Sequence, residues 1–561
     1  MTEPLLSVQD LYVTLAGRGR TQPLVEDVSF EVERAKILSI VGESGSGKSM
    51  TAKALLGLLP PKVHATGEAW FRGQNLLAPG VEPPRGKGIG LIFQEPMTAL
   101  TPVLTIGTLL TEAVIVHGLL SGAEARREAI AMLDRVGIPE PAARMRQYPH
   151  ELSGGMRQRV MIAMMMMLKP DILIADEPTT ALDVTVQAQI LDLLRDIVQE
   201  THVGLILITH DMGVVAEMAD DVLVMRAGRT VEAAPTPKLF AAPSAPYTKA
   251  LLDAVPRLDA PGRSVAPRSE EALLSARNLR KTFRARAGLL GTGSVTHAID
   301  DVSLDVRRGE TFALVGESGS GKSTLGRVFA RLTDADDGEV TLGGQDLIAL
   351  RGNALRAVRH RVQMIFQDPY ASLDPRQRIG STIAEPIRIQ AKLPRKERQN
   401  RVMALLKRVG LGSEAAARYP HEFSGGQRQR IAIARAIAAG PDLIVADEPT
   451  SALDVSIQDQ ILVLLAELKR EDGLTLLFIS HDLAVVRQIA DRVAVMRCGR
   501  VLEMGPTEEV WRNPRHAYTR ALIDAAPRPD PTRKRGVRAP LTGSYPSGDL
   551  IEAAPGHWVA A

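Results

Sequence analysis

Two stretches of the chain have the residue types that bind the phosphates of a nucleotide. Residues 42–49 read Gly-Glu-Ser-Gly-Ser-Gly-Lys-Ser, and residues 316–323 repeat these letters without a change. In such a loop, backbone N–H groups at the start of a helix wrap the phosphate oxygens, and glycine permits the close approach. The lysine then reaches the outer phosphates, and the last serine holds Mg²⁺. The sequence therefore predicts two sites for a nucleoside triphosphate with magnesium.

We name these stretches the first phosphate loop (residues 42–49) and the second phosphate loop (residues 316–323). The residues expected to contact nucleotide or magnesium at the loops are Gly42, Ser44, Gly45, Gly47, Lys48, Ser49 and Met50, and in the second copy Gly316, Ser318, Gly319, Gly321, Lys322, Ser323 and Thr324.

A pair of acidic residues ends an apolar run in each half of the chain. Asp176 and Asp447 occupy the position from which a carboxylate binds Mg²⁺. The next residues, Glu177 and Glu448, can polarise the attacking water. A single acidic pair of this kind is more often a solvated loop, but both pairs continue as Pro-Thr and then Ala-Leu-Asp. The repetition favours catalysis over a solvated loop.

A histidine followed by aspartate ends another apolar run in each copy, at His210 and His481. A lone histidine usually has a structural role. Two at equivalent positions favour a contact to the γ-phosphate, and we expect them to act with the two glutamates as catalytic residues.

The spacing of these residues implies the elements that carry them. Apolar runs precede the phosphate loops and helix-forming sequence follows, which is the strand–loop–helix context that such loops require. Further continuous apolar runs predict strands of a sheet covered on both faces. Between residues 94 and 153 the pattern turns helical, which indicates an inserted helical subdomain. The runs are 37–41, 172–175 and 205–208 in the first copy and 312–315, 443–446 and 476–479 in the second, with helices expected at 50–59, 123–136 and 324–332.

The duplication divides the chain into two α/β domains. We expect the first domain at residues 1–255, a Pro-rich linker at 256–271, the second domain at 272–530 and an irregular tail at 531–561. A repeat of this length is a duplicated domain and not a solenoid unit.

Composition excludes several classes of protein. The 561 residues are 45% hydrophobic and 24% charged, with a net charge of +3, so nothing suggests a nucleic-acid partner. The basic residues at 533–538 are expected to be a solvated tail. No apolar run reaches the ~18 residues that span a bilayer, and no secretory signal is evident, so we expect a cytosolic chain.

We expect neither the single cysteine nor the run of four methionines to take part in catalysis or metal binding. The lone Cys498 excludes disulfides within the chain, and because Ala227 is its counterpart we expect a small buried residue. Four methionines at 164–167 suggest a soft-metal site, but residues 435–438 of the second copy cannot ligate metal. We therefore expect the methionines to pack in a helix core.

Together these motifs resemble the ATP-binding subunits of ABC transporters over nearly the whole chain. The tripeptides Ser153-Gly154-Gly155 and Ser424-Gly425-Gly426 resemble the signature of that family. The resemblance implies two tandem P-loop NTPase domains of the ABC ATPase type, each with a RecA-like sheet core and an inserted helical subdomain. It also implies head-to-tail pairing, with each ATP between the phosphate loop of one domain and the signature of the other.

The family resemblance assigns roles to further residues. Gln94 and Gln367 match the Q-loop, which senses Mg²⁺ and the attacking water and couples to the membrane subunits. Relatives place an aromatic residue near the N-terminal strand to stack on adenine. Phe283 fits this role in the second copy, whereas Leu15 occupies the matching place in the first.

Further segments of the sequence indicate a subfamily. Residues 93–100 and 366–373 resemble the two ATPase subunits of dipeptide and oligopeptide importers, and residues 245–252 and 516–522 match a helix typical of that group. The fusion of both subunits resembles glutathione-type and microcin-type importers. Relatives often carry a cysteine-rich tail that binds an iron–sulfur cluster, but the end of this chain lacks its cysteines and no cluster is expected.

The resemblance implies an ATPase that uses ATP and Mg²⁺ to power the import of di- or oligopeptides or related solutes. Expected partners are two integral-membrane permease subunits and, indirectly, an extracytoplasmic solute-binding protein. The expected location is peripheral, on the cytoplasmic face of the inner membrane. Another solute, such as an opine, a sugar or a metal chelate, stays open. A soluble ABC protein of translation or DNA repair is disfavoured, because the linker is short and Pro-rich and zinc cysteines are absent.

Overall fold

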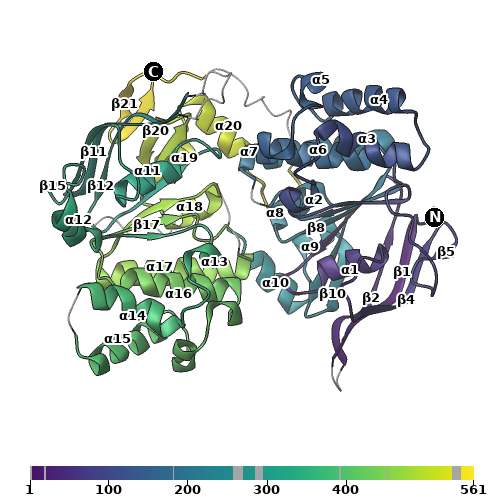
Figure 1. Cartoon of the computed structure of the whole chain (residues 1–561), viewed down its shortest axis with the longest axis horizontal. Coiled ribbons are helices and arrows are strands. Elements are labelled where there is room, and N and C mark those ends of the chain that lie inside the picture. Colours follow the sequence, from purple (N-terminus) through teal and green to yellow (C-terminus); the bar gives the residue numbers. More distant parts are fainter. Residues whose placement is uncertain are drawn as a thin grey trace. The chain divides into compact units, whose positions relative to one another are not determined.

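The computed structural model describes two compact units (Figure 1). The first comprises Met1–Leu182, Val186–Val255 and Pro527–Gly536, and the second comprises Asp183–Thr185, Pro256–Ala526 and Val537–Ala561. The described residues are 3–17, 21–180, 182–256, 270–284, 295–390, 393–451, 453–533 and 545–561. Most of the expected linker, at 257–269, and part of the expected tail, at 534–544, lie outside them.

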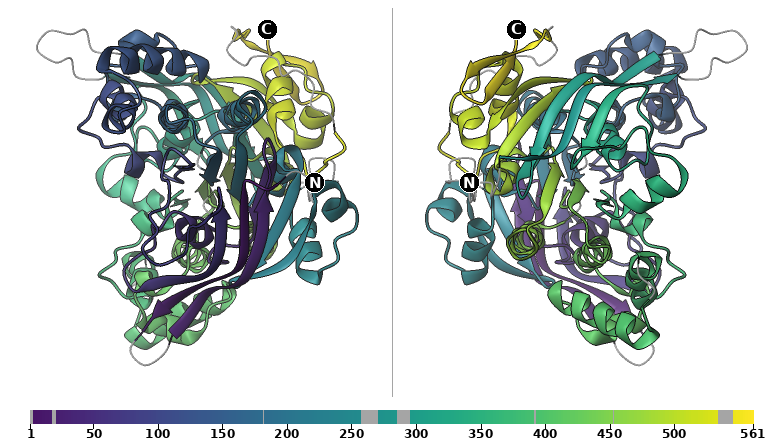
Figure 2. Two further views of the ribbon diagram at one scale, coloured as in Figure 1. Left: turned by 90° about the vertical axis from the view of Figure 1, so that its right-hand side faces the viewer. Right: turned by 90° about the vertical axis from the view of Figure 1, so that its left-hand side faces the viewer.

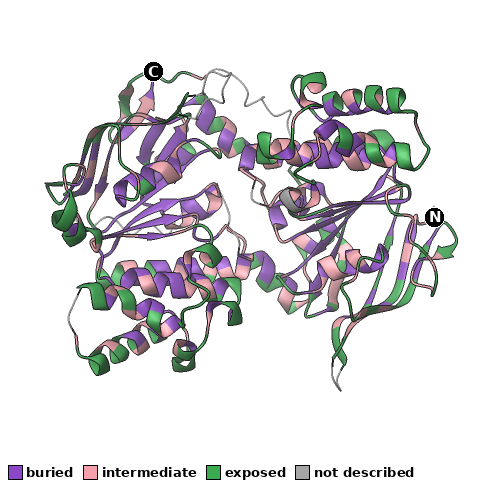
Figure 3. Ribbon diagram, viewed as in Figure 1, coloured by how far each residue is buried: buried purple, intermediate pink, exposed green. Residues whose placement is uncertain are grey.

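The core of the first unit is a largely parallel sheet in the order β10-β9-β3-β8-β7-β6. Its inner strands are buried along their length because both faces are covered (Figure 3). The bounds are β3 Ile37–Val41, β6 Ile89–Ile92, β7 Ile172–Asp176, β8 Gly204–Thr209, β9 Asp221–Arg226 and β10 Arg229–Pro235. The strands predicted at 37–41, 172–175 and 205–208 are thus confirmed.

A second, antiparallel sheet of the first unit has the order β2-β1-β4-β5 (Figure 2, purple strands). Its inward positions alternate with exposed ones, as expected for a sheet with one face on the core. The bounds are β1 Leu6–Ala16, β2 Thr21–Val32, β4 Val63–Phe71 and β5 Gln74–Asn75.

The inserted helical subdomain is also present. Helices α3, α4 and α6 pack against one another between β6 and β7 in the chain. Helix α4 begins at Gly122, where Ser121 and Glu124 form a capping box. The helices of this unit are α1 Lys48–Leu55, α2 Pro96–Ala99, α3 Ile106–Val116, α4 Gly122–Arg135, α5 Pro141–Arg144, α6 Gly154–Met166, α7 Val184–Thr201, α8 Met212–Met218, α9 Thr236–Ala241 and α10 Pro246–Asp253.

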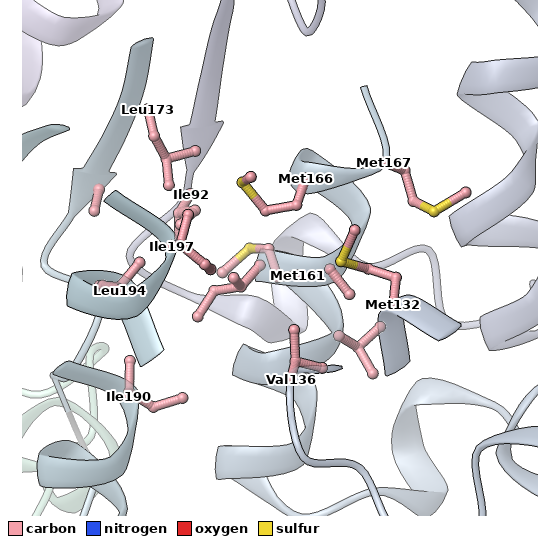
Figure 4. Packing of buried hydrophobic residues seen from close by; sticks show 14 of the residues in the cluster. Ile92, Met132, Val136, Met161, Met166, Met167, Leu173, Ile190, Leu194 and Ile197 are labelled. Atoms are coloured by element: carbon pink, nitrogen blue, oxygen red, sulfur yellow. The ribbon is translucent and has the colours of Figure 1, made fainter. Parts of the chain in front are cut away.

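The methionine run packs as the sequence predicts. Met166 and Met167 are buried in the cluster shown in Figure 4, and Met164 and Met165 pack against it half-buried. The surrounding residues are aliphatic, including Leu194 and Ile197 of α7. Flexible thioether side chains fill the irregular space between α6 and the sheet.

The second unit repeats the arrangement and extends it. Its antiparallel sheet has the order β12-β11-β14-β15, and its core sheet has the order β16-β17-β18-β13-β19-β20-β22-β21. The strand bounds are β11 Ala272–Arg284, β12 Val295–Arg307, β13 Thr311–Val315, β14 Asp337–Leu342, β15 Gln345–Asp346, β16 Val362–Ile365, β17 Leu443–Asp447, β18 Thr475–Ile479, β19 Arg492–Arg497, β20 Arg500–Pro506, β21 Leu550–Ala554 and β22 His557–Ala560.

The helices of the second unit follow the order of the first, except that α12 is added between β15 and β16 and a 3₁₀ helix at Ser413–Ala417 stands in the place of α5. They are α11 Lys322–Phe329, α12 Gly352–Arg359, α13 Pro369–Ser372, α14 Ile379–Gln390, α15 Arg395–Arg408, α16 Gly425–Ile437, α17 Val455–Asp472, α18 Leu483–Ile489, α19 Thr507–Arg512 and α20 Ala517–Ala525. The helices after the phosphate loops, α1 and α11, begin at the loop lysines, two residues earlier than the sequence analysis expected.

Two sequence expectations are corrected. The end of the chain is not irregular throughout, because β21 and β22 form a hairpin that pairs with β20. Cys498 is exposed and not buried. It lies with Gly499 in the turn between β19 and β20, and both residues have positive φ values, 48° and 82°. Within this turn Cys498 is exposed, whereas Gly499 is buried and its N–H donates to the carbonyl oxygen of Ser320 at 3.0 Å.

Among the described residues, no helix is both long enough and apolar enough to cross a membrane.

Candidate active site

The first phosphate loop joins β3 to α1, and the side chain of its lysine donates hydrogen bonds to carbonyl oxygens of the same loop. Lys48 is 5% exposed, and its Nζ donates to the carbonyl oxygens of Gly42 at 2.7 Å and Glu43 at 2.9 Å. Gly42 has a φ of 151°, and a Cβ there would lie 2.2 Å from the carbonyl oxygen of Met225. Only glycine therefore fits where the loop crosses β9.

The second phosphate loop has the same geometry between β13 and α11. Lys322 Nζ donates to the carbonyl oxygens of Gly316 and Glu317, each at 2.7 Å. Burial lowers the pKa of Lys322. A buried ammonium at the N-terminus of a helix is suited to a phosphate anion. The other predicted loop residues lie in the same two segments, at the N-termini of α1 and α11.

A serine and a buried aspartate meet next to each phosphate loop. Ser49 Oγ donates to Asp176 Oδ1 at 2.9 Å, and Ser323 Oγ donates to Asp447 Oδ1 at 2.8 Å. Burial raises the pKa of both aspartates. Each pair offers two neighbouring oxygen donors, one of them a buried carboxylate in need of a cation, which is the donor chemistry that Mg²⁺ prefers.

Glu177 lies at the centre of a polar cluster in the first unit. Its carboxylate accepts hydrogen bonds from Gln94 Nε2 at 2.7 Å and from Thr180 Oγ1 at 2.9 Å, and its Oε1 lies 3.3 Å from Nδ1 of His210. Burial raises the pKa of Glu177, but His210 and Thr180 outweigh it and lower that pKa to about 2. The carboxylate is therefore ionised at neutral pH.

The second unit repeats this cluster around Glu448. Gln367 Nε2 donates to Glu448 Oε2 at 2.9 Å, and His481 Nδ1 lies 3.2 Å from Oε1. Burial opposes ionisation of both groups, but their interaction lowers the pKa of Glu448 and raises that of His481. Ser451 occupies the position equivalent to Thr180, and its Oγ donates to the backbone carbonyl oxygen of Glu448 at 3.2 Å.

The two signature tripeptides start helices of the helical subdomains. Ser153 caps α6 by accepting from Met156 N, and Ser424 caps α16 by accepting from Gln427 N. Within the first unit, α6 belongs to a different hydrophobic cluster from α1, which carries the phosphate loop. In the first unit, the phosphate loop and the signature therefore start helices that pack in different hydrophobic clusters.

The residues expected near adenine lie on matching strands. Phe283 is on β11 and is 47% exposed, with Lys281 Nζ 5.5 Å from its ring centroid. Leu15 occupies the matching place on β1 and is half-buried. Tyr12 pairs with Thr66 in a run of the β1–β4 register that is regular through Leu15. It therefore points to the opposite face from Leu15.

Sequence reasoning missed three residues next to the site. Thr180 donates to the carboxylate of Glu177, and Ser451 donates to the backbone carbonyl oxygen of Glu448. The signal was a hydroxyl residue three positions after each glutamate in both copies. The third is Tyr518 of α20, whose hydroxyl accepts from Glu317 N of the second phosphate loop at 3.3 Å. It lies in the repeated segment 516–522, to which the sequence analysis gave no catalytic role.

Comparison with known proteins agrees with the duplication. A family model described as ABC transporter matches residues 25–180 and 299–451. A second, described as oligopeptide/dipeptide transporter, C-terminal region, matches residues 231–288 and 502–550.

Curated relatives match over nearly their whole length. The chain is 47% identical to the glutathione import ATP-binding protein GsiA of Escherichia coli (strain K12), over 99% of this chain and 96% of the relative. It is 46% identical to GsiA of Pectobacterium atrosepticum over the same shares. Among solved structures, the dimeric structure of MJ0796, a bacterial ABC transporter cassette, is 31% identical and covers 42% of this chain and 98% of its own, with a TM-score of 0.38.

The predicted fold class, two ABC ATPase domains in tandem, is confirmed by the family match in both halves. Three observations point to the same activity. They are the duplicated phosphate loops, the ionised glutamates beside them, and the similarity to ATP-binding subunits over nearly the whole chain. The chain belongs to the ABC transporter family as a tandem ATP-binding subunit that hydrolyses ATP.

Proposed function

We propose that this chain powers an importer of di- or oligopeptides or related small solutes, and that glutathione is a candidate solute. The observation that carries the proposal is the similarity over 99% of the chain to proteins named for glutathione import. The match of both C-terminal segments to the oligopeptide/dipeptide transporter region supports it.

We propose that each cluster around Glu177 and Glu448 polarises the water that attacks the γ-phosphate. Both glutamates are ionised, and each is oriented by a glutamine and a histidine (Gln94 and His210 in the first unit). A positioned base of this kind contributes directly to phosphoryl transfer. Ser49 with Asp176, and Ser323 with Asp447, would hold Mg²⁺, which neutralises phosphate charge when bound. Gln94 and Gln367 would sense the same ion.

We further propose two composite sites formed head to tail. One site would combine Lys48, Glu177 and His210 with Ser424-Gly425-Gly426, and the other would combine Lys322, Glu448 and His481 with Ser153-Gly154-Gly155. In the first unit, the signature helix packs in a different hydrophobic cluster from the phosphate-loop helix, which supports this pairing.

The solute is tested by uptake. Cells that express the chain with its permeases and binding protein should accumulate labelled glutathione or a labelled dipeptide, and Lys48→Ala together with Lys322→Ala should abolish the uptake. Uptake of an opine, a sugar or a metal chelate in place of both would refute the peptide assignment.

The expected partners give a second prediction, on the membrane attachment of the chain. Two permease subunits should recruit the chain to the cytoplasmic face of the inner membrane, by docking on the helical segments after Gln94 and Gln367. Fractionation with the permeases co-expressed should place the chain in the membrane pellet, and fractionation without them should not. Salt-resistant pelleting without permeases would contradict this proposal.

A third prediction rests on the difference between Leu15 and Phe283. Stacking of an aromatic ring on a base is worth roughly 1–3 kcal/mol by alanine substitution, and leucine retains part of it. We expect the Lys48 site to bind ATP several-fold more weakly than the Lys322 site, and Leu15→Phe to narrow the gap. Nucleotide titration with Lys48 or Lys322 replaced in turn measures this. Equal affinities, or no gain from Leu15→Phe, would show that these positions do not govern adenine binding.

A further inference from the structure

The end of the chain folds back on the second unit and fastens there. Residues 545–561, which we name the clasp, contain β21 and β22, and β22 pairs with β20 through Trp558 and Met504. The last residue closes the clasp on itself, because Gly548 N donates to the carbonyl oxygen of Ala561 at 3.2 Å. The clasp therefore has a defined seat on the core sheet.

A buried pair of side chains anchors the hairpin of the clasp. His557 and Glu503 are each fully buried, with His557 Nε2 2.7 Å from Glu503 Oε1. Glu503 also accepts from the backbone N–H of Arg515 at 2.8 Å and of His516 at 3.1 Å. One carboxylate thus ties β22 to the segment that begins α20.

Backbone carbonyls at the start of the clasp are held as well. The carbonyl oxygen of Pro546 lies 3.0 Å from His516 Nε2, and that of Ser547 accepts from Arg500 at 2.7 Å. These contacts fix the position of the preceding residue, Tyr545.

Tyr545 packs directly against Tyr518. The two rings meet edge to face, with centroids 5.5 Å apart and planes inclined by 69°. The guanidinium of Arg497 lies 4.5 Å from the ring centroid of Tyr545 and 5.2 Å from that of Tyr518. Edge-to-face pairs and cations over aromatic rings are both favourable, so Tyr545 restrains Tyr518 and Arg497 together.

Tyr518 connects this packing to the second phosphate loop. Its side chain is fully buried, and its hydroxyl accepts from Glu317 N at 3.3 Å. Burial raises the pKa of Tyr518, so the hydroxyl stays protonated. The carbonyl oxygen of Glu317 in turn accepts from Lys322. Glu317 is therefore held on one side by the loop lysine and on the other by the tyrosine that the clasp supports.

We propose that the clasp positions the second phosphate loop through Tyr518, so that the affinity of the Lys322 site for ATP depends on Tyr545. Tyr518 and Tyr545 are positioning residues, since they act on nucleotide through the backbone of the loop. All of these contacts lie within the second unit, so the effect belongs to the Lys322 site alone. The inference rests on the proposed role of Lys322 in binding ATP.

The test uses the full chain with one site disabled. In Lys48→Ala, which leaves only the Lys322 site, Tyr545→Ala should weaken binding of the fluorescent nucleotide TNP-ATP about threefold to tenfold, because an edge-to-face contact is lost. Tyr545→Phe keeps the ring and should restore the affinity. Ile551→Ala, on the same hairpin but exposed, is the matched control and should bind as the parent does.

A reciprocal arm separates positioning from loss of fold. In Lys322→Ala, which leaves the Lys48 site, Tyr545→Ala should not change TNP-ATP affinity, and the melting temperature should stay within a few degrees of the parent. Equal weakening at both sites, or none at the Lys322 site, overturns the proposal. If Lys322→Ala and Lys48→Ala together leave nucleotide binding intact, the proposed function of the phosphate loops fails instead.

Discussion

Replacing either Glu177 or Glu448 by glutamine is expected to reduce steady-state ATP hydrolysis by the whole chain far below one half. The substituted site should lose roughly a hundredfold or more in turnover, because the ionised group that polarises the water is gone. Two independent sites would leave half of the activity. If both sites must complete each cycle, the residual activity is far below one half, and this is the result we expect.

ATP binding should survive both substitutions, because Lys48 and Lys322, the proposed phosphate contacts, are left in place. Phosphate release in a coupled assay measures hydrolysis, and TNP-ATP titration measures binding. Glu31→Gln on β2 and Glu339→Gln on β14 are matched controls, since both glutamates are exposed and lie away from the clusters. If one glutamine variant hydrolyses ATP and supports uptake as the parent does, only one site is competent.

The second large effect is expected from the signatures. A photoreactive ATP analogue trapped with vanadate should label both halves of the chain, and a protease site placed in the expected linker at 256–271 separates them. In the head-to-tail arrangement, Ser424→Arg should remove label from the half that contains Lys48. Ser153→Arg should remove it from the half that contains Lys322.

Label lost from the half that carries the substitution would contradict head-to-tail pairing. Both serines also cap helices, and loss of a cap costs about 1 kcal/mol in its own half. Ser121→Arg controls for this cost, because Ser121 caps α4 with the same side-chain-to-backbone hydrogen bond. It should leave labelling of both halves intact.

The sequence predicts the local parts of the site well. A phosphate loop is contiguous, so its strand–loop–helix context could be predicted directly at β3 and α1. Glu177 and His210 directly follow strands β7 and β8, which are parallel neighbours, so the meeting of these two side chains follows from topology. The hydrogen bond from Gln94 Nε2 to Glu177 depends on the path of the loop after β6. Hydrophobic periodicity gives no information on that path, so only the family resemblance indicated this contact.

Other features could not be predicted from the sequence, because the residues that determine them lie far apart in the chain. The hairpin of β21 and β22 is short and rich in small residues. It pairs with β20, a strand that lies more than 40 residues earlier in the chain. Tyr518 looks like an ordinary helix residue until Glu317 N is placed beside its hydroxyl. Cys498 was expected to be buried because Ala227 is small, although its turn position decides its exposure.

The clasp also changes what the core sheet of the second unit offers to other molecules. Strand β20 would otherwise present a row of unsatisfied N–H and C=O groups, which is a template for pairing with another chain. Glu503 and Met504 of β20 instead pair with Val559 and Trp558. A chain shortened before Tyr545 would move the edge of this sheet from β21 back to β20. The uncovered N–H and C=O groups of β20 would then favour self-association during synthesis and folding.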